Sequence, residues 1–289
     1  MTTDKIHEIL EALDHYDGKY KRAEVNAALE VREEITPHLI GLLENILVDP
    51  QKYLDEEHDA HPYALVLLAH WREQKAHEVI VKIFSLPGKL TGDLFGDMKT
   101  ETLPVALFLT CGSSVDKIRE LVLNKNANEY CRGSALKAMA YAAVSGIAER
   151  DETINFFATL FTGNEAEPDS YFWCELACCI LDLYPEGYMD VIGKACDDGL
   201  IYPGYVGMSS FERVLKDGKE KTISRLQEDI ERSASHDIHD YMSLWSCYDQ
   251  KKYNALPPSM PGGSVKKSKA KSKSNKKMAK ASRKKNRKK

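Results

Sequence analysis

The chain has 289 residues, a hydrophobic fraction of 43% and a formal net charge of −4, values that are ordinary for a protein able to bury a sizeable core. The N-terminus has no basic segment followed by an apolar run, and the longest strongly apolar stretch, Tyr63 to Trp71, is far too short to span a bilayer. We therefore expect a cytoplasmic protein with no secretory signal and no membrane contact, whose seven cysteines are reduced.

Helical periodicity begins at the N-terminus. Residues 4–16 place Ile6, Ile9 and Leu13 on one face, and a second segment follows Gly18. Thr36-Pro37 predicts a helix start, because threonine is a favourable N-cap and proline lacks an N–H that the first turn leaves unpaired. Asp49-Pro50 predicts the end of that helix, since the residue before proline is pushed out of the α region.

From Tyr63 onward the predicted helices come in pairs. They are residues 63–71 with 79–84, 103–110 with 115–124, 130–145 with 151–161, and 173–184 with 188–196. Pro87-Gly88 ends the first pair, Gly199 ends the last, and the glycines between residues 92 and 96 predict a turn between repeats.

Two more helices complete the predicted fold. Ser209 and Glu212 form a capping-box pattern, and residues 219–233 form a charged amphipathic helix. Short helices in repeated pairs of roughly 30 to 45 residues are typical of α-solenoids. We predict an all-α, HEAT-like α-solenoid, a superhelix of antiparallel helix pairs, over residues 1–250. A compact all-α bundle is the structural alternative, because the repeats follow no strict consensus.

The C-terminal part differs in composition. Residues 251–263 form a Pro/Gly linker, and residues 264–289 form a Lys-rich tail that we expect to be disordered, because it has almost no large hydrophobic residue to bury. From residue 266 onward the tail holds 14 Lys or Arg and no acid, so the other 26 bases face all 44 acids, a net of −18. Such a tail predicts non-specific binding to a polyanion such as RNA. The predicted polyanion-binding residues are Lys266, Lys267, Lys269, Lys271, Lys273, Lys276, Lys277, Lys280, Arg283, Lys284, Lys285, Arg287, Lys288 and Lys289.

The body carries the opposite charge. Residues 151–200 contain 11 acids and one base, Lys194. We predict an acidic surface for a basic protein partner or for the chain's own tail, while a solvated exterior without a partner is the simpler interpretation. The candidate residues are Glu165, Glu167, Asp169, Glu186, Asp190, Asp197 and Asp198.

Several stretches resemble a known family. Tyr16-Asp-Gly-Lys-Tyr-Lys-Arg-Ala-Glu, Glu129-Tyr-Cys-Arg-Gly-Ser-Ala-Leu and Gly199-Leu-Ile-Tyr-Pro-Gly-Tyr resemble segments of a largely bacterial family known as domain of unknown function 1186. The resemblance spans residues 4–215 and implies a HEAT-like helical repeat fold with no established activity. Many members of this family carry a C-terminal cysteine-rich zinc module, whereas no Cys or His follows Cys247 here.

The polar clusters give weak metal candidates. His236, His239 and Asp240 share a predicted helix face, and Glu57 to His61 form another cluster, but neither has an evident further ligand. We therefore predict no metal and no cofactor. Cys174, Cys178 and Cys196 could approach each other, but their spacing is not that of a usual zinc site, and we expect small buried thiols.

No sequence motif indicates a catalytic residue, so the sequence favours a non-catalytic interaction or scaffold protein. A metal-dependent enzyme using the His/Asp clusters and an adaptor inhibited by its own tail are the alternatives. Tyr63, Tyr202 and Tyr205 are candidate surface anchors for a partner.

Overall fold

A computed structural model describes residues 2–54, 58–235 and 237–248. Within these ranges every regular element is a helix, which confirms the all-α class, and the β pairing is limited to an isolated bridge between Pro87 and Ala127. The chain divides into two compact units, Met1–Leu244 and Trp245–Lys289. The described part of the second unit is a short 3-10 helix, η3 (Ser246–Tyr248). The predicted linker and tail lie outside the described residues.

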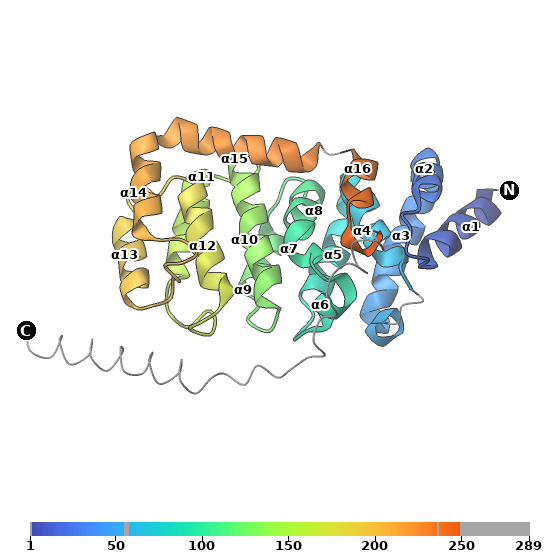
Figure 1. The fold of residues 1–289 in the computed structure, drawn as a ribbon, viewed down its shortest axis with the longest axis horizontal. Coiled ribbons are helices and arrows are strands. Elements are labelled where there is room, and N and C mark those ends of the chain that lie inside the picture. The colour runs from blue at the N-terminus through green and yellow to red at the C-terminus, as the bar shows by residue number, and fades with distance from the viewer. Residues whose placement is uncertain (1, 55–57, 236, 249–289) are drawn as a thin grey trace, which may run out of the picture. The chain divides into compact units, whose positions relative to one another are not determined.

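The first unit is built from short helices (Figure 1). They are α1 (Thr2–Asp14), α2 (Arg22–Glu30), α3 (Arg32–Val48), η1 (Pro50–Leu54), α4 (Ala60–His70), η2 (Gln74–Ala76), α5 (His77–Phe84), α6 (Leu90–Phe95), α7 (Met98–Glu101), α8 (Leu103–Thr110), α9 (Asp116–Leu123), α10 (Glu129–Val144), α11 (Arg150–Thr159), α12 (Tyr171–Asp182), α13 (Met189–Asp197), α14 (Met208–Asp217), α15 (Lys219–Ala234) and α16 (Ile238–Ser243).

Helices that follow one another in the chain pack side by side (Figure 1). α4, α8, α10 and α12 form one series, each packed on the next, while α3 packs on α4 and α5, and α5 packs on α9. The helix at the centre is α10, which contacts α8, α9, α11, α12 and α15 and is buried on nearly every side. Its many alanines permit this close packing, because small side chains let neighbouring helices approach.

The C-terminal helices of this unit run back along the row. α15 follows α14 after a turn at Gly218 (φ 92°) and packs on α14, α12, α10 and α8 (Figure 1). α16 then reaches the N-terminal helices, where the His239 ring bonds Tyr20 and Asn26. The last helix of the unit is thus joined directly to α2 and to the segment before it.

Arginine side chains close the C-terminal ends of several helices. Arg32 donates to the Trp71 carbonyl after α4 at 2.9 Å, and Arg150 donates to the Leu183 and Tyr184 carbonyls after α12 at 2.7 and 2.8 Å. These carbonyls have no partner within their own helix, and the helix dipole favours a cation there. The arginines therefore fasten neighbouring helices to each other.

Three local predictions were wrong. α3 begins at Arg32 rather than at Thr36-Pro37, and the Thr36 hydroxyl donates back to the Arg32 carbonyl instead of capping a helix. Residues 92–95 belong to helix α6, whose Leu94 and Phe95 are buried, so the predicted turn is confined to Gly96 (φ 51°). The N-cap of α14 is Gly207, so Ser209 lies inside the first turn.

The remaining predicted helices are observed with boundaries shifted by a few residues. None of the helices in the described ranges is long and apolar enough to cross a membrane.

Candidate functional site

The predicted acidic residues lie on α13, directly after it, and on the loops before and after α12. Six of them are exposed, namely Glu167, Asp169, Glu186, Asp190, Asp197 and Asp198. Lys194 pairs with Asp198. Glu165 differs, because its side chain is only 15% exposed and faces Arg132 and Lys125. Glu165 therefore belongs to an internal network, and the other six form the exposed acidic set.

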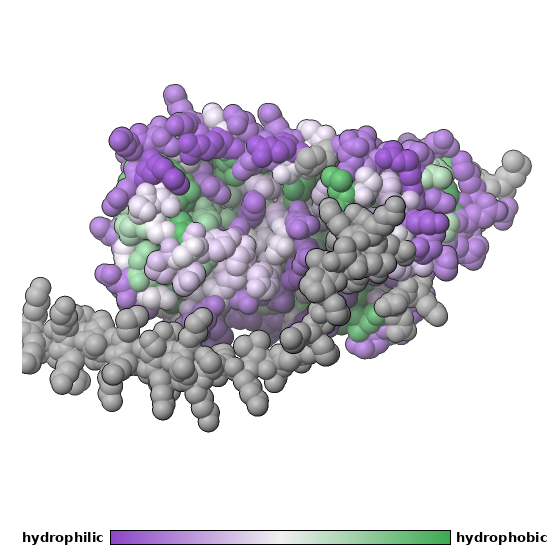
Figure 2. Space-filling model, in the orientation of Figure 1, coloured by the Kyte–Doolittle hydropathy of each residue, from purple (hydrophilic) through white to green (hydrophobic). Residues whose placement is uncertain are grey.

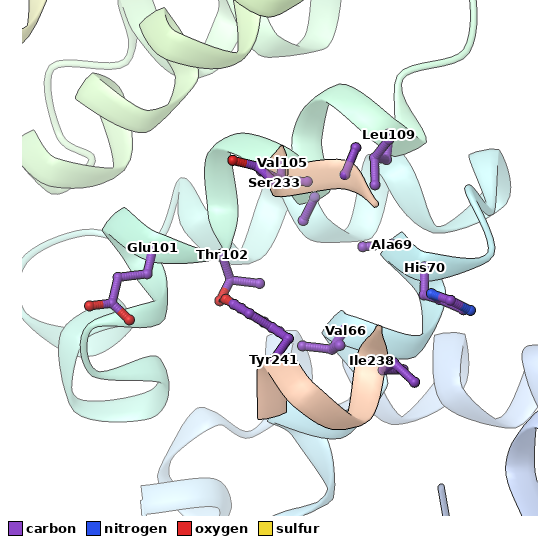
Figure 3. A pocket seen from close by; sticks show the side chains of 12 residues that line it. Val66, Ala69, His70, Glu101, Thr102, Val105, Leu109, Ser233, Ile238 and Tyr241 are labelled. Carbon is purple, nitrogen blue, oxygen red and sulfur yellow. The ribbon is translucent and has the colours of Figure 1, made fainter. Parts of the chain in front are cut away.

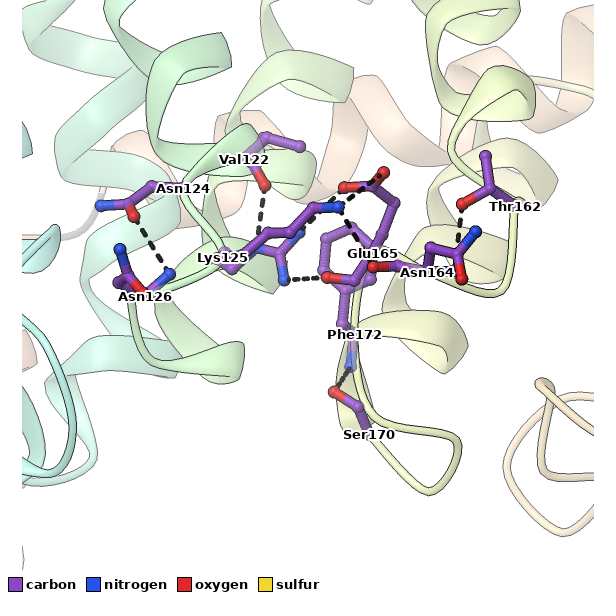
Figure 4. Close-up of polar contacts among 10 residues, drawn as sticks. Val122, Asn124, Lys125, Asn126, Thr162, Asn164, Glu165, Ser170 and Phe172 are labelled. Atoms are coloured by element: carbon purple, nitrogen blue, oxygen red, sulfur yellow. Dashed lines mark hydrogen bonds and ion pairs between the residues drawn. The ribbon is translucent and has the colours of Figure 1, made fainter.

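That internal network surrounds a buried arginine (Figure 4). Arg132, whose side chain is 3% exposed, donates from Nε to the Val122 carbonyl at 2.8 Å and from Nη1 to the Glu165 carbonyl at 2.7 Å. Its guanidinium lies 4.0 Å from the centre of the Phe172 ring. Burial lowers the pKa of Arg132, and the Glu165 carboxylate opposes this shift. The arginine thus joins α9, α10, α12 and the loop before α12.

The weak metal candidates are held by other contacts. Tyr20 Oη and His239 Nδ1 are 2.6 Å apart, and His239 Nε2 lies 2.9 Å from Asn26 Oδ1, so both ring nitrogens are hydrogen-bonded. Asp240 is exposed, and His236 lies outside the described residues. Across the ranges that the structure covers, no group of three or more His, Cys, Asp or Glu is arranged to hold a metal ion. A metal at His239 would have to displace one of these hydrogen bonds.

The cysteines are free thiols, of which Cys174 is buried, as predicted, whereas Cys178 and Cys196 are only half-buried. Burial raises the pKa of Cys178 to about 12, and the nearby Glu175 and Asp182 add to the shift. The thiolate is the nucleophile and the metal ligand, so this environment disfavours both roles.

A surface of tyrosines and carboxylates on α10, α12 and the loop before α14 was not predicted as a unit. We call it the tyrosine face, and it consists of Tyr130, Tyr171, Tyr202, Tyr205, Glu175 and Asp182. The Tyr130 and Tyr171 ring centroids are 4.8 Å apart, and Tyr171 meets Tyr205 edge-on at 5.9 Å. Tyr202 is 69% exposed and Tyr205 52% exposed, as expected of surface anchors, whereas Tyr63 is fully buried and that expectation was wrong.

The backbone allows this close arrangement of aromatic rings. A Cβ on Gly133 would lie 3.0 Å from a Tyr171 ring carbon, tighter than an ordinary contact, so glycine at this position favours the close approach of α12 to α10. In the loop before α14, Ile201 and Val206 are buried, and their anchorage leaves Tyr202 and Tyr205 at the surface. The sequence signal is the helical spacing of Tyr171, Glu175 and Asp182, which places them along one side of α12.

The carboxylates of the tyrosine face are only partly compensated. Tyr171 donates its hydroxyl to Glu175 Oε2 at 2.6 Å. Burial raises the pKa of Asp182 to about 6, an effect that Lys137 opposes and Glu175 reinforces. No hydrogen bond or ion pair within the described ranges reaches the Asp182 side chain.

A pocket of about 220 Å³ lies between α4, α8, α15 and α16 (Figure 3). Val66, Val105 and Leu109 supply apolar walls, and the hydroxyls of Thr102 and Tyr241 bond each other. Ligand pockets usually measure roughly 300 to 1,000 Å³. This pocket is smaller than that range, and we attach no function to it.

Comparison with known sequences places these features in a family. Residues 4–249 match the family described as "Protein of unknown function (DUF1186)". The chain belongs to DUF1186. The resemblance inferred from the sequence is thus confirmed, and the matched region extends past residue 215.

Two relatives of this chain are uncharacterised proteins of Chlamydia. The chain is 28% identical over 246 residues to one from Chlamydia trachomatis serovar D, covering 84% of this chain and 96% of the relative. It is 30% identical over 225 residues to one from Chlamydia muridarum, covering 78% and 89% respectively. No solved structure matches the chain.

The DUF1186 region contains the Arg132 network, the exposed acids and the tyrosine face, while the 14 basic residues of the tail lie outside it. Functional questions about the helical body and about the tail are therefore separable.

Proposed function

We propose that this protein is a non-catalytic interaction protein, in which a HEAT-like α-solenoid presents an acidic surface to a protein partner and the basic tail binds a polyanion such as RNA. The packing of α4, α8, α10 and α12 in chain order supports the solenoid, because such repeats contact mainly their neighbours. An extended helical surface of this kind suits binding to another protein.

The observation that carries this proposal is the division of charge. The tail from residue 266 onward carries 14 bases and no acid, while the rest of the chain has a net charge of −18. Six of the seven candidate acids are exposed in the described body. The two parts therefore attract partners of opposite charge, and the body itself repels nucleic acid.

Binding of the full-length protein to labelled poly(U) RNA, measured against salt concentration, tests the role of the tail. Each tail cation paired with a phosphate contributes about −0.7 to the slope of log K against log salt for a single strand, so 14 cations set a limit near −10. We expect strong binding at low salt with a steep negative slope.

Two variants define the result. A protein that ends at Met260 should lose the binding, whereas a full-length protein whose residues 264–289 are shuffled should keep it, because the contact depends on charge and not on order. Retention of RNA by the truncated protein at low salt would refute the assignment. A shuffled tail that fails to bind would point to specific recognition instead.

A further inference from the structure

The exposed aromatic side chains of the body are concentrated in one place. Seven large hydrophobic residues are exposed in the described ranges, and three of them, Tyr130, Tyr202 and Tyr205, belong to the tyrosine face. Over α10 and α12, Figure 2 shows a pale surface below the strongly hydrophilic α15. Tyrosine is enriched at the centres of protein interfaces, because it buries a large rigid ring and keeps a polar hydroxyl.

The same face favours a positively charged occupant. Glu175, which is 9% exposed, accepts a hydrogen bond from the Tyr171 hydroxyl, Asp182 lies two turns further along α12, and Lys137 is the base that faces both carboxylates. Asp182 is half-buried, and no hydrogen bond among the described residues reaches its side chain, so a cation placed beside it would stabilise its negative charge. Lys99 already places its ammonium 5.6 Å from the centre of the Tyr130 ring, which indicates that these rings accept a cation.

We propose that the tyrosine face binds a basic segment of a partner protein, with arginine side chains stacked on its exposed rings and paired with its two carboxylates. Guanidinium suits this surface because it stacks on aromatic rings and donates to a carboxylate through two parallel hydrogen bonds. Nucleic acid does not suit it, since phosphates would meet Glu175 and Asp182. This inference rests on the proposed protein-binding role of the acidic body and gives that role a location.

The test is fluorescence anisotropy with the full-length protein and a labelled peptide of alternating arginine and serine, at physiological ionic strength. A peptide with glutamine in place of arginine is the probe control. We expect the Tyr205→Ala and Asp182→Asn variants each to weaken binding of the arginine peptide by about tenfold or more, the size of a central interface contact.

Matched variants elsewhere on the body distinguish binding at this face from non-specific attraction to the negatively charged body. Tyr16→Ala removes another exposed ring and Glu44→Gln, on α3, another exposed acid, and each should change the affinity by less than about twofold. Tyr202→Ala, at a 69% exposed residue, repeats the aromatic test should Tyr205→Ala lower stability.

The outcomes are distinct. Equal weakening by Glu44→Gln and Asp182→Asn would overturn the tyrosine face as the site while leaving an acidic body that binds cations. An unchanged affinity in both Tyr205→Ala and Tyr202→Ala would also overturn it. If the arginine peptide bound no better than the glutamine peptide, both the face and the proposed protein-binding role of the body would be refuted, and RNA binding by the tail would be unaffected.

Discussion

Replacing Arg132 by alanine should destabilise the body strongly. The change removes two hydrogen bonds from a buried guanidinium, to the Val122 and Glu165 carbonyls, and the stacking on Phe172. Charge-assisted hydrogen bonds contribute about 1.5 to 3 kcal/mol each, and breaking a buried ionic contact costs about 3 to 5 kcal/mol. We therefore expect the free energy of unfolding to fall by about 4 kcal/mol.

Urea unfolding followed by far-ultraviolet circular dichroism measures this loss. With a slope of about 3 kcal/mol per molar urea, 4 kcal/mol corresponds to a midpoint lower by about 1.3 M. Arg119→Ala is the matched control, because the Arg119 guanidinium lies 4.1 Å from the Phe156 ring centre but is exposed. That control should cost less than about 1 kcal/mol.

Arg132→Lys adds a second comparison. Lysine keeps the charge, but its single ammonium cannot reproduce the planar set of donors that reaches both carbonyls, so most of the loss should persist. If Arg132→Ala lowers the midpoint no more than Arg119→Ala does, the argument that this arginine fastens three helices is wrong.

Two further predictions concern pH. Burial, reinforced by Asp14, raises the pKa of Asp59 to about 7. The free energy of unfolding therefore falls as pH rises from the unfolded pKa of Asp59 through 7, because ionising the carboxyl in the folded protein is unfavourable. Asp59→Asn should therefore stabilise the protein at pH 8 by about 1 to 3 kcal/mol, measured as a rise in melting temperature, and an equal gain at pH 5 would contradict the reasoning. Burial lowers the pKa of His77 to about 4, so its neutral ring contributes stability that is present above the unfolded pKa and lost as pH falls from there through 4. The stability advantage of the wild type over His77→Asn should shrink by about 2 kcal/mol between pH 7.5 and pH 5, and a difference independent of pH would exclude His77 as the source.

The helices were predictable where local chemistry decides the structure. The predicted 103–110 helix coincides with α8, because a single apolar run has Pro104 in its first turn and ends just before the turn residues Gly112, Ser113 and Ser114. Local rules failed at Thr36-Pro37, where tertiary contacts extend the helix backward. Arg32 bonds the end of α4 and stabilises the extra turn, and no local pattern could reveal that distant partner.

The candidate site was predictable only in part. Charge is a property of the sequence, so the acidic residues could be selected directly, but Glu165 looked like its neighbours and is held internally by a residue on α10. Exposure of a tyrosine depends on which helices cover it. Tyr63 and Tyr205 therefore looked equivalent, although one is fully buried in α4 and the other is 52% exposed. The tyrosine face could not be predicted, because its residues come from α10, α12 and the loop before α14, which are brought together only by the fold.

The contact between α16 and the N-terminal helices has a consequence for synthesis on the ribosome. Tyr20 and His239 are separated by 219 positions in the chain. The surface around Tyr20 and Asn26 that contacts α16 therefore stays exposed while nearly the whole body is translated. Because closing so long a segment is entropically costly, we expect α15 and α16 to dock last, after the other helices have packed in order. Nascent chains that stop before α16 would then display a surface that the finished body conceals, and this interval is when chaperones could engage it.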